Sequence, residues 1–432
     1  MISKFAILFL VFFPFASVSQ SKWNITFGTE EFTGLIRKNL PEDLPQKIVQ
    51  NNKGEYYISG TNNFKDGEPK PESQGTWIAK FSPEGKLLWY RVGDPNFLKC
   101  FPNQLIATSD GGVVLSGYES GAAPDYNKDG LILYKYNNSG DLLKKTHFVK
   151  SLNAGDKTAE KGGNPIFTFE NSDGNISVIA SVSVRQNAIR NGQNYSEINH
   201  QTWLLNYSSN LEFINAYILD IPDISISVYD FTVFTKFDNR FCSDGSFSII
   251  KKDRENNQFF TLYKFDKTGK KLWSADKTYN GPILYYGITH LPTGKPLLHA
   301  NVDINNANNA CDLYTVFNDN GEQELEFKTK YEGFITDVII VEGEFIVNFQ
   351  FGLGEGKFGL KKINNQGKEL WRKTFGVKNS LSINCIPALD KGFAMLAYTK
   401  DYNASYIDAL IIKTDENGIT DLVPKKYAKA TP

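Results

Sequence analysis

Hydrophobic and polar residues alternate in short runs along most of the chain, and clusters of Gly, Asn, Asp and Ser separate these runs. Trp77-Ile78-Ala79-Lys80-Phe81 is a typical run. Because successive side chains of a strand point to opposite faces, this pattern predicts β-strands joined by turns. No long segment shows the spacing of an amphipathic helix. The sequence therefore predicts an all-β protein.

A first family of glycine turns recurs along the chain, and each member precedes an apolar run. Successive members lie 49 to 71 residues apart, which is the period of a four-stranded propeller blade with variable loops. The members are Gly54, Gly111, Gly174, Gly245, Gly294, Gly343 and Gly392.

A second family of turns follows the first in every unit, 24 to 36 residues later. Its glycines are Gly85, Gly140, Gly269, Gly321, Gly367 and Gly418. In the third unit we expect Asn210 to take this place, since Asn also adopts the left-handed conformation. Each unit thus has strands A to D, with short A–B and C–D turns.

Seven such units predict a seven-bladed β-propeller of four-stranded antiparallel blades. The segment Trp23 to Gly28 resembles the strand D segment Trp371 to Gly376, yet no strands A to C precede it. We expect it to pair with strand C of the last unit, near Leu410 to Thr414, and so to close the ring. One propeller would span residues 20–423, followed by a tail at 424–432.

The N-terminal residues 1–19 have the features of a signal peptide. Lys4 precedes an apolar stretch from Phe5 to Ala16, and small residues follow at Ser17-Val18-Ser19. The apolar stretch is shorter than the roughly 20 residues that span a bilayer. We therefore expect a secreted monomer without a transmembrane segment, in an extracellular, periplasmic or cell-surface location.

Composition narrows the possible partners and cofactors. The 432 residues include 47 Lys and Arg and 48 Asp and Glu, so no broad basic surface is expected and nucleic acid is not a predicted partner. Four cysteines, Cys100, Cys242, Cys311 and Cys385, are widely spaced without a zinc-binding pattern. Free buried thiols are favoured over disulfides.

Three strand D segments, GKLLW, GKKLW and GKELW, place Trp89, Trp273 and Trp371 four residues after a turn glycine. They resemble the tryptophan-docking motif of quinoprotein-dehydrogenase-like propellers, and the repeat as a whole resembles exported bacterial propellers. The resemblance implies the propeller fold. The adjacent cysteine pair of many of those dehydrogenases is missing, so no quinone cofactor is expected. We expect the tryptophans to pack between blades instead of stacking on sugars.

Two repeated or motif-like features favour structural roles. Lysines stand five residues before the second-turn glycine in five units, and we expect their stems to lie on apolar neighbours while the ammonium groups remain hydrated. Asp125-Tyr126-Asn127-Lys128-Asp129-Gly130 resembles the start of a calcium loop. Positions 9 and 12 would be Leu133 and Tyr136, however, so no cofactor is predicted and calcium remains the less favoured alternative.

Loop length is unequal between the two faces of the predicted propeller. The B–C and D–A connections, such as residues 61–75, 118–129 and 185–200, are long and share one face, on which recognition is expected. Candidate ligand-binding residues there combine aromatic and charged side chains: Phe64, Asp66, Tyr118, Asp125, Tyr126, Arg185, Arg190 and Tyr195. No catalytic residue and no metal ligand is predicted.

Two functions are compatible with this arrangement. The first is a non-enzymatic binding module that recognises a glycan or a protein through the long-loop face. The alternative is a polysaccharide hydrolase or lyase with carboxylates in the central funnel, because sequence does not show which acids lie close together.

Overall fold

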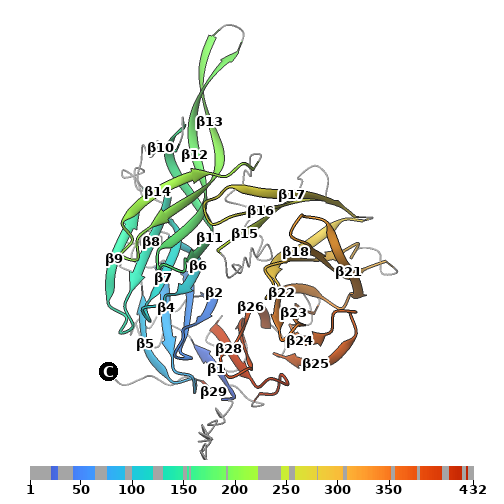
Figure 1. Ribbon diagram of the computed structural model, residues 1–432. Coiled ribbons are helices and arrows are strands. Elements are labelled where there is room, and N and C mark those ends of the chain that lie inside the picture. Colours follow the sequence, from blue (N-terminus) through green and yellow to red (C-terminus); the bar gives the residue numbers. More distant parts are fainter. Residues whose placement is uncertain are drawn as a thin grey trace, which may run out of the picture.

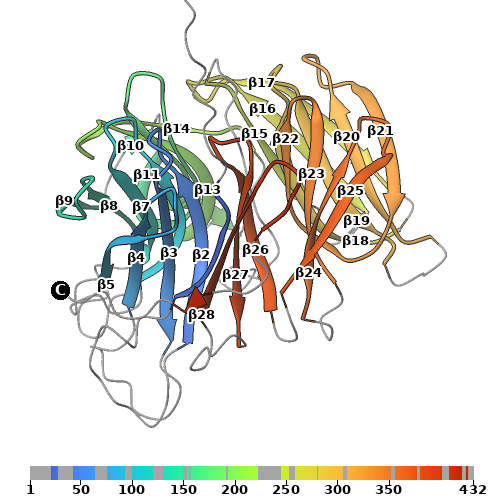
Figure 2. The same ribbon diagram turned by 90° about the horizontal axis from the view of Figure 1, so that it is seen from below.

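Seven antiparallel sheets are arranged as blades around a common centre in the computed structural model (Figure 1). This confirms the predicted seven-bladed propeller. The innermost strands lie around the centre and the outermost strands form the rim, and a view turned by 90° shows the inner strands running side by side (Figure 2). The structure describes residues 21–27, 42–63, 75–92, 100–119, 130–148, 153–154, 157–190, 193–221, 245–252, 258–279, 281–304, 309–351, 356–376, 380–400, 408–420 and 425–426.

The first three blades follow the chain from the inside outwards. Blade 1 consists of β2 (Glu42–Gln50), β3 (Tyr56–Asn63), β4 (Gly75–Phe81) and β5 (Leu87–Val92). Blade 2 consists of β6 (Cys100–Ala107), β7 (Val113–Glu119), β8 (Gly130–Tyr136) and β9 (Leu142–His147). Blade 3 consists of β10 (Asn153–Ala154), β11 (Lys157–Glu170), β12 (Ile176–Arg190), β13 (Gln193–Tyr207) and β14 (Phe213–Ile218).

The next three blades repeat this order. Blade 4 contains β15 (Phe247–Lys252), β16 (Phe259–Phe265) and β17 (Lys271–Thr278), and its expected strand A lies outside the described residues. Blade 5 contains β18 (Ile283–His290), β19 (Pro296–Val302), β20 (Cys311–Phe317) and β21 (Gln323–Lys330). Blade 6 contains β22 (Phe334–Val341), β23 (Glu344–Gln350), β24 (Phe358–Ile363) and β25 (Glu369–Phe375).

Blade 7 closes the ring with both ends of the chain. It consists of β26 (Ser380–Pro387), β27 (Phe393–Thr399), β28 (Asp408–Thr414), β1 (Trp23–Phe27) and β29 (Lys425–Lys426). Strand β1 pairs antiparallel with β28, from Trp23 opposite Lys413 to Phe27 opposite Ala409. The predicted closure is confirmed. Strand β29, which lies in the segment expected to be a tail, adds a parallel edge to β1.

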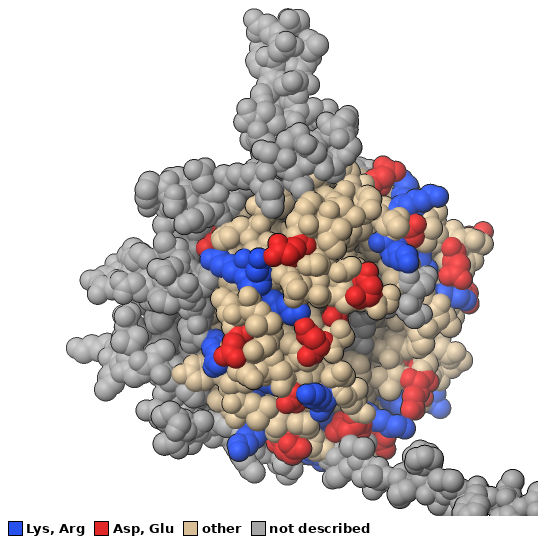
Figure 3. Space-filling view, turned by 60° about the vertical axis from the view of Figure 1, so that its left-hand side comes forward, with Lys and Arg blue, Asp and Glu red and all other residues tan. Residues whose placement is uncertain are grey.

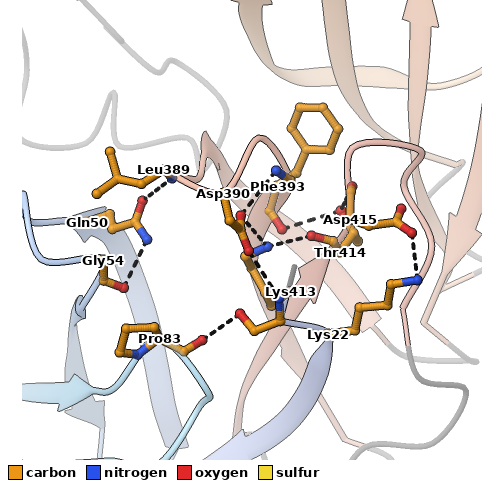
Figure 4. A network of polar contacts seen from close by, with 12 residues as sticks. Lys22, Gln50, Gly54, Pro83, Leu389, Asp390, Phe393, Lys413, Thr414 and Asp415 are labelled. Carbon is orange, nitrogen blue, oxygen red and sulfur yellow. Dashed lines mark hydrogen bonds and ion pairs between the residues drawn. The ribbon is translucent and has the colours of Figure 1, made fainter. Parts of the chain in front are cut away.

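Polar contacts reinforce this closure on the side of the turns (Figure 4). Lys22 pairs with Asp415 at 2.7 Å, and Lys413 pairs with Asp390 at 2.8 Å. The Leu389 amide donates to Oε1 of Gln50, which ties blade 7 to blade 1. The N-terminal strand is therefore held by its ladder to β28 and by the adjacent ion pair of Lys22 and Asp415.

Most turns of the two families have the same conformation: an amide donates to the carbonyl three residues earlier and the turn residue has a positive φ, as in Gly85, whose amide donates to Ser82. The A–B turn of blade 6 is instead a two-residue hairpin in which Glu342 (φ 54°) and Gly343 (φ 82°) both have a positive φ. Two positions differ from the prediction. In blade 3 the left-handed residue is Leu211 (φ 59°) and not Asn210, and in the last A–B turn it is Lys391 (φ 68°) and not Gly392.

Glycine at the second turn makes room for an aromatic ring of the preceding blade. A Cβ on Gly140 would lie 2.7 Å from the ring of Trp89, and a Cβ on Gly85 would lie 2.5 Å from the ring of Trp23. The Trp89 indole N–H also donates to the Asn138 carbonyl at 2.9 Å. The tryptophans thus pack between blades, as expected, and this contact sets the distance between neighbouring rims.

Most of the repeated lysines are buried, so for them the expectation of hydrated ammonium groups was wrong. Lys80 is 1% exposed and Lys413 is fully buried, whereas Lys362 remains partly exposed and pairs with Glu344 of its own blade. Lys80 pairs with Glu55 of its own A–B turn at 2.8 Å and donates to the Asn138 carbonyl of the next blade at 3.2 Å. Lys135 repeats the arrangement with Asp110 at 2.6 Å and the Ser209 carbonyl at 2.7 Å. Lys80 and Lys135 therefore link blades 1 and 2, and blades 2 and 3, respectively.

Candidate functional site

The sequence-predicted site residues fall into three groups. Phe64, Asp66, Asp125 and Tyr126 lie outside the described residues. Tyr118 lies in β7, at the end of that strand nearest the B–C connection. The third group is Arg185, Arg190 and Tyr195, which lie in strands β12 and β13 instead of in the expected loop.

The extension of β12 and β13 distinguishes blade 3 from the other blades. Each strand has 15 residues, and the ladder continues from Ile176 opposite Tyr207 to Arg190 opposite Gln193. Strand β11 pairs with β12 only as far as Val184, and β14 pairs with β13 only from Trp203 onwards. Residues 185–190 and 193–199 therefore form a two-stranded ribbon, which projects from the ring in Figure 1.

The ribbon has a sequence signal that loop prediction overlooked. Asn191-Gly192 stands between two polar segments, and Asn-Gly is the preferred pair for a two-residue hairpin. The six residues from Arg185 to Arg190 add roughly 20 Å to the strand at about 3.3 Å per residue. Arg185, paired with Ile198, stands at the base, and Tyr195, paired with Ala188, lies farther out.

The second half of the calcium loop considered as an alternative is a buried strand. Gly130 to Tyr136 form β8, and the positions that would supply late calcium ligands, Leu133 and Tyr136, are buried in the blade. Asp125 to Asp129 lie outside the described residues. Within the described parts of the chain, no three His, Cys, Asp or Glu side chains come together as metal ligands.

A histidine and a carboxylate do meet on this side of blade 2. Nδ1 of His147, at the end of β9, lies 3.1 Å from Oε2 of the buried Glu119 at the end of β7, and Lys145 lies 3.7 Å from the same carboxylate. Strand β9 is the outermost strand of its blade. The pair therefore lies at the rim and not at the mouth of the central funnel, where the enzymatic alternative would place its acids.

Sequence reasoning missed an aromatic cluster between blades 5 and 6. Its members are Tyr285 on β18, Tyr331 in the D–A connection, and Phe334 at the start of β22, all partly exposed. The ring centroids of Tyr285 and Phe334 are 4.3 Å apart, and those of Tyr331 and Phe334 are 6.1 Å apart. These residues lie at the D–A ends of inner strands, so the cluster belongs to the long-loop face.

A β-bulge directs Tyr285 into this cluster. The β18–β19 register shifts between Ile283 and Tyr286, which leaves Leu284 and Tyr285 in the bulge. Bulges can re-aim a side chain. The inner strands of five other blades have a bulge of one residue, and none of those residues is aromatic: Gln46, Asn103, Ile166, Thr336 and Ile383. Tyr285 is thus a departure from the repeat.

A buried polar network lies directly behind the aromatic cluster. Nζ of Lys361, on β24, lies 2.6 Å from Oδ2 of Asp312, on β20, and the side chains of both residues are 2% exposed. Asn301 donates to Oδ1 of Asp312 at 2.7 Å and to the Gly333 carbonyl at 3.3 Å, and it accepts from the Ile335 amide at 2.8 Å. The network therefore fixes the D–A connection that carries Tyr331 and Phe334.

Two further contacts hold the same connection. Arg372 pairs with Glu332 at 2.5 Å and also contacts Glu369. A Cβ on Gly333 would lie 2.1 Å from the Gln350 carbonyl oxygen, so only glycine allows this close approach of two backbones. The connection is consequently fixed by side chains on both sides and by backbone packing beneath.

Burial shifts the acid–base properties of these groups. Burial raises the pKa of Asp312 to about 6, against the opposing effects of the Lys361 charge and of hydrogen bonds from Lys361, Thr329 and Asn301. Burial, followed by the negative charge of Asp312, raises the pKa of Tyr331 to about 12. Tyr331 therefore remains a neutral phenol at physiological pH, with an aromatic face and a hydroxyl group available for contacts.

Lys361 could have been recognised in the sequence as an exception. It stands six residues before the second-turn glycine, where other blades have Ala79, Tyr134, Tyr263, Thr315 and Ile412. The neighbouring Lys362 belongs to the repeated lysines, and the Lys-Lys pair hides the exception. Its partner Asp312 lies 49 residues earlier, so pairing could not be read from spacing.

Charges of both signs are interspersed on the described part of the surface in Figure 3. This distribution agrees with the formal net charge of −1. No helix in the described part of the chain is long and apolar enough to cross a membrane. Cys311 and Cys385 are free thiols, and the other two cysteines are not described at the side-chain level.

No protein family model matches the chain, and no curated protein does so. Among solved structures, a protein of unknown function from Bacteroides caccae is 13% identical, with TM-score 0.40 over 69% of this chain and 90% of its own. One of unknown function from Dyadobacter fermentans is 10% identical, with TM-score 0.43 over 91% and 98%.

The β-propeller domain of the Trilobed protease from Pyrococcus furiosus is 10% identical, with TM-score 0.46 over 89% of this chain and 98% of its own. The present chain is a seven-bladed β-propeller that resembles bacterial proteins of unknown function and the β-propeller domain of a protease, and no specific family is assigned to it.

Proposed function

We propose that the protein is an exported, non-enzymatic binding module that recognises a glycan or a protein partner with its long-loop face. The observation that carries this proposal is the difference between the two faces of the propeller. On one face the A–B and C–D turns are short and, except at Gly343, share one conformation, and the buried Lys80 and Lys135 tie turns of neighbouring blades together. On the other, blade 3 extends into the ribbon of residues 185–190 and 193–199.

A two-stranded ribbon of this length supports a role in recognition. Ribbon backbone beyond Val184 has neither β11 nor β14 beside it, so its outer N–H and C=O groups face solvent or a partner. The ribbon sequence is rich in Asn, Gln and Arg, which are residue types found mostly at protein surfaces. A rigid scaffold that holds polar, variable segments is the usual arrangement of a binding surface.

The test compares the full chain with a variant whose ribbon is shortened. Residues 186–197 are replaced by Asn-Gly, which joins the paired residues Arg185 and Ile198 through a two-residue turn. Both proteins are applied to arrays of extracellular polysaccharides and of purified envelope proteins. We expect the full chain to retain at least one ligand, and the shortened variant to bind it at least about tenfold more weakly at an unchanged melting temperature.

Two outcomes would contradict the proposal. If the ribbon-shortened variant and the full chain retained the same ligands with equal affinity, the ribbon would have no part in recognition. If a retained polysaccharide were cleaved, product formation would support the hydrolase or lyase alternative in place of a binding module.

A further inference from the structure

We infer that the aromatic cluster of Tyr285, Tyr331 and Phe334 is a binding subsite for a neutral sugar ring of an oligosaccharide. The inference rests on the proposed function, because the cluster lies on the long-loop face. It names the ligand class and a place that differs from the candidate residues of blades 1 to 3.

The first argument is the chemistry of the cluster. The three rings come from two blades and contact one another while each remains partly exposed. Aromatic faces with a polar edge bind the C–H face of a pyranose while hydroxyl groups hydrogen-bond nearby. The two phenol groups supply such polar edges, since Tyr331 remains protonated.

The second argument is that this place departs from the repeat in two ways at once. Tyr285 lies in a bulge, whereas the one-residue bulges in the inner strands of five other blades hold Gln, Asn, Thr or Ile. Lys361 replaces a residue that is apolar or uncharged at the same position of the other blades. Residues that stabilise the ring recur from blade to blade, whereas these two exceptions coincide at one junction.

The third argument is rigidity. Asn301, Asp312 and Lys361 are almost completely buried and hold the connection that carries Tyr331 and Phe334. A buried ion pair contributes less to stability than well-packed apolar side chains would. It does provide directed bonds that fix a loop, and a fixed loop loses less conformational entropy when a ligand binds.

Charge selects a neutral sugar over an acidic one. Around the cluster, Asp312, Glu332 and Glu369 supply three carboxylates, and Lys361 and Arg372 supply two cations. Both cations are already paired with these acids. A uronic acid would therefore meet excess negative charge from these five groups, whereas a neutral hexose or pentose would meet no such repulsion. The exposed Lys330, next to Tyr331 in the chain, is the cation that would offset this repulsion, and the comparison with hexagalacturonate below tests its effect.

The experiment uses the full chain and a defined panel of neutral hexasaccharides: cellohexaose, laminarihexaose, maltohexaose, mannohexaose and xylohexaose. Binding is measured by isothermal titration calorimetry. We expect at least one to bind, and Tyr331→Ala and Tyr285→Ala each to weaken its binding by about tenfold or more. Tyr217→Ala is the matched control, because Tyr217 is an exposed tyrosine on the outermost strand of blade 3. The Tyr217→Ala variant should bind the same oligosaccharide with the affinity of the unchanged protein.

The outcomes separate this inference from the proposed function. Failure of the whole panel to bind, or equal affinity of both tyrosine variants and the unchanged protein, would overturn the subsite. Tighter binding of hexagalacturonate than of every neutral sugar would overturn the neutral class. If the tyrosine variants bind normally while ribbon shortening abolishes binding, the subsite fails and the proposed function stands.

Discussion

The interface between blades 1 and 2 and the interface between blades 5 and 6 are alike at the rim and different inside. At the rim, Trp89 packs on Gly140 in the first, and Phe327 packs on Gly367 in the second. Inside, the first is an apolar cluster that includes Tyr57, Ile78 and Leu115. The second contains the buried pair of Asp312 and Lys361 beside its apolar residues.

This difference distinguishes residues that recur from blade to blade and stabilise the ring from residues that are found at one blade interface only. Another exception, Leu211, is explained by packing. Blade 2 has the exposed Lys144 where blade 1 has Trp89, and the next blade has a buried Leu211 where a glycine would receive the ring. The Asp312–Lys361 pair has no such explanation, since apolar residues would pack as well. A role in holding the D–A connection accounts for it.

The largest expected effect comes from removing Lys361. Lys361→Met leaves Asp312 buried without its cation and should lower the free energy of unfolding by about 3–5 kcal/mol. In the interface between blades 2 and 3, Lys135→Met leaves Asp110, whose side chain is half exposed, in contact with water. That variant should lose only about 1–2 kcal/mol, mainly through the unsatisfied Ser209 carbonyl. Urea denaturation of both variants measures the contrast.

The double variant Lys361→Met with Asp312→Asn provides the control. It removes both charges and should recover most of the lost stability. If Lys361→Met cost no more than Lys135→Met, the two lysines would be equivalent, and the distinction between the interfaces would fail.

The second prediction concerns the turn glycines at the rims of the two interfaces. Replacing either glycine by alanine should lower the free energy of unfolding by a similar amount. The alanine of the Gly140→Ala variant must adopt a positive φ, which should lower the free energy of unfolding by about 1–2 kcal/mol. It must also displace the Trp89 ring, at about 1–3 kcal/mol more. Gly367→Ala, which meets Phe327 at 2.9 Å, should have a similar cost.

Gly111→Ala is the matched control for this prediction. Gly111 has a φ of 82°, against 83° for Gly140, and a Cβ there would meet nothing closer than 4.0 Å. Only the backbone cost of about 1–2 kcal/mol should remain. Equal losses for Gly111→Ala and Gly140→Ala in urea denaturation would show that the ring contact does not set the rim.

The fold could be predicted because its signals are local and repeated. A left-handed turn position favours glycine whatever its surroundings, so thirteen turn glycines could be recognised from spacing. The prediction failed where packing replaced glycine, at Leu211, and where a neighbour took the left-handed conformation, at Lys391. The lysines were misjudged because their partners, such as Glu55 and the Asn138 carbonyl, come from other turns.

The candidate site was much harder to predict, because its parts are distant in sequence. Tyr285 and Phe334 belong to adjacent blades and meet only after the ring has formed. The ribbon was interpreted as a loop because its residues are polar, although Asn191-Gly192 indicated a hairpin. Phe64, Asp66, Asp125 and Tyr126 remain predictions, since they lie outside the described residues.

The smallest expected effect concerns pH. The contributions of Asp312 and Asp110 to the free energy of unfolding should change in opposite directions as the pH rises. Burial raises the pKa of Asp312 to about 6, so the folded state binds more protons than the unfolded state between about pH 4 and 6. Its contribution to the free energy of unfolding should therefore fall as the pH rises through this range. Asp110 is the opposite case. Burial opposes its ionisation, but hydrogen bonds from Lys135, Thr108 and the Gly112 amide leave its pKa below the usual value.

The contribution of Asp110 should accordingly be complete above about pH 4 and be lost as the pH falls below it. The measurement is urea denaturation of the unchanged protein, Asp312→Asn and Asp110→Asn between about pH 3.5 and 7, with each variant subtracted from the unchanged protein. The difference in the free energy of unfolding between the unchanged protein and Asp312→Asn should decrease towards neutral pH. The corresponding difference for Asp110→Asn should decrease towards acidic pH. If both decreased towards acid, Asp312 would behave as another carboxylate of the repeated ties, and the interior of the interface between blades 5 and 6 would be no exception.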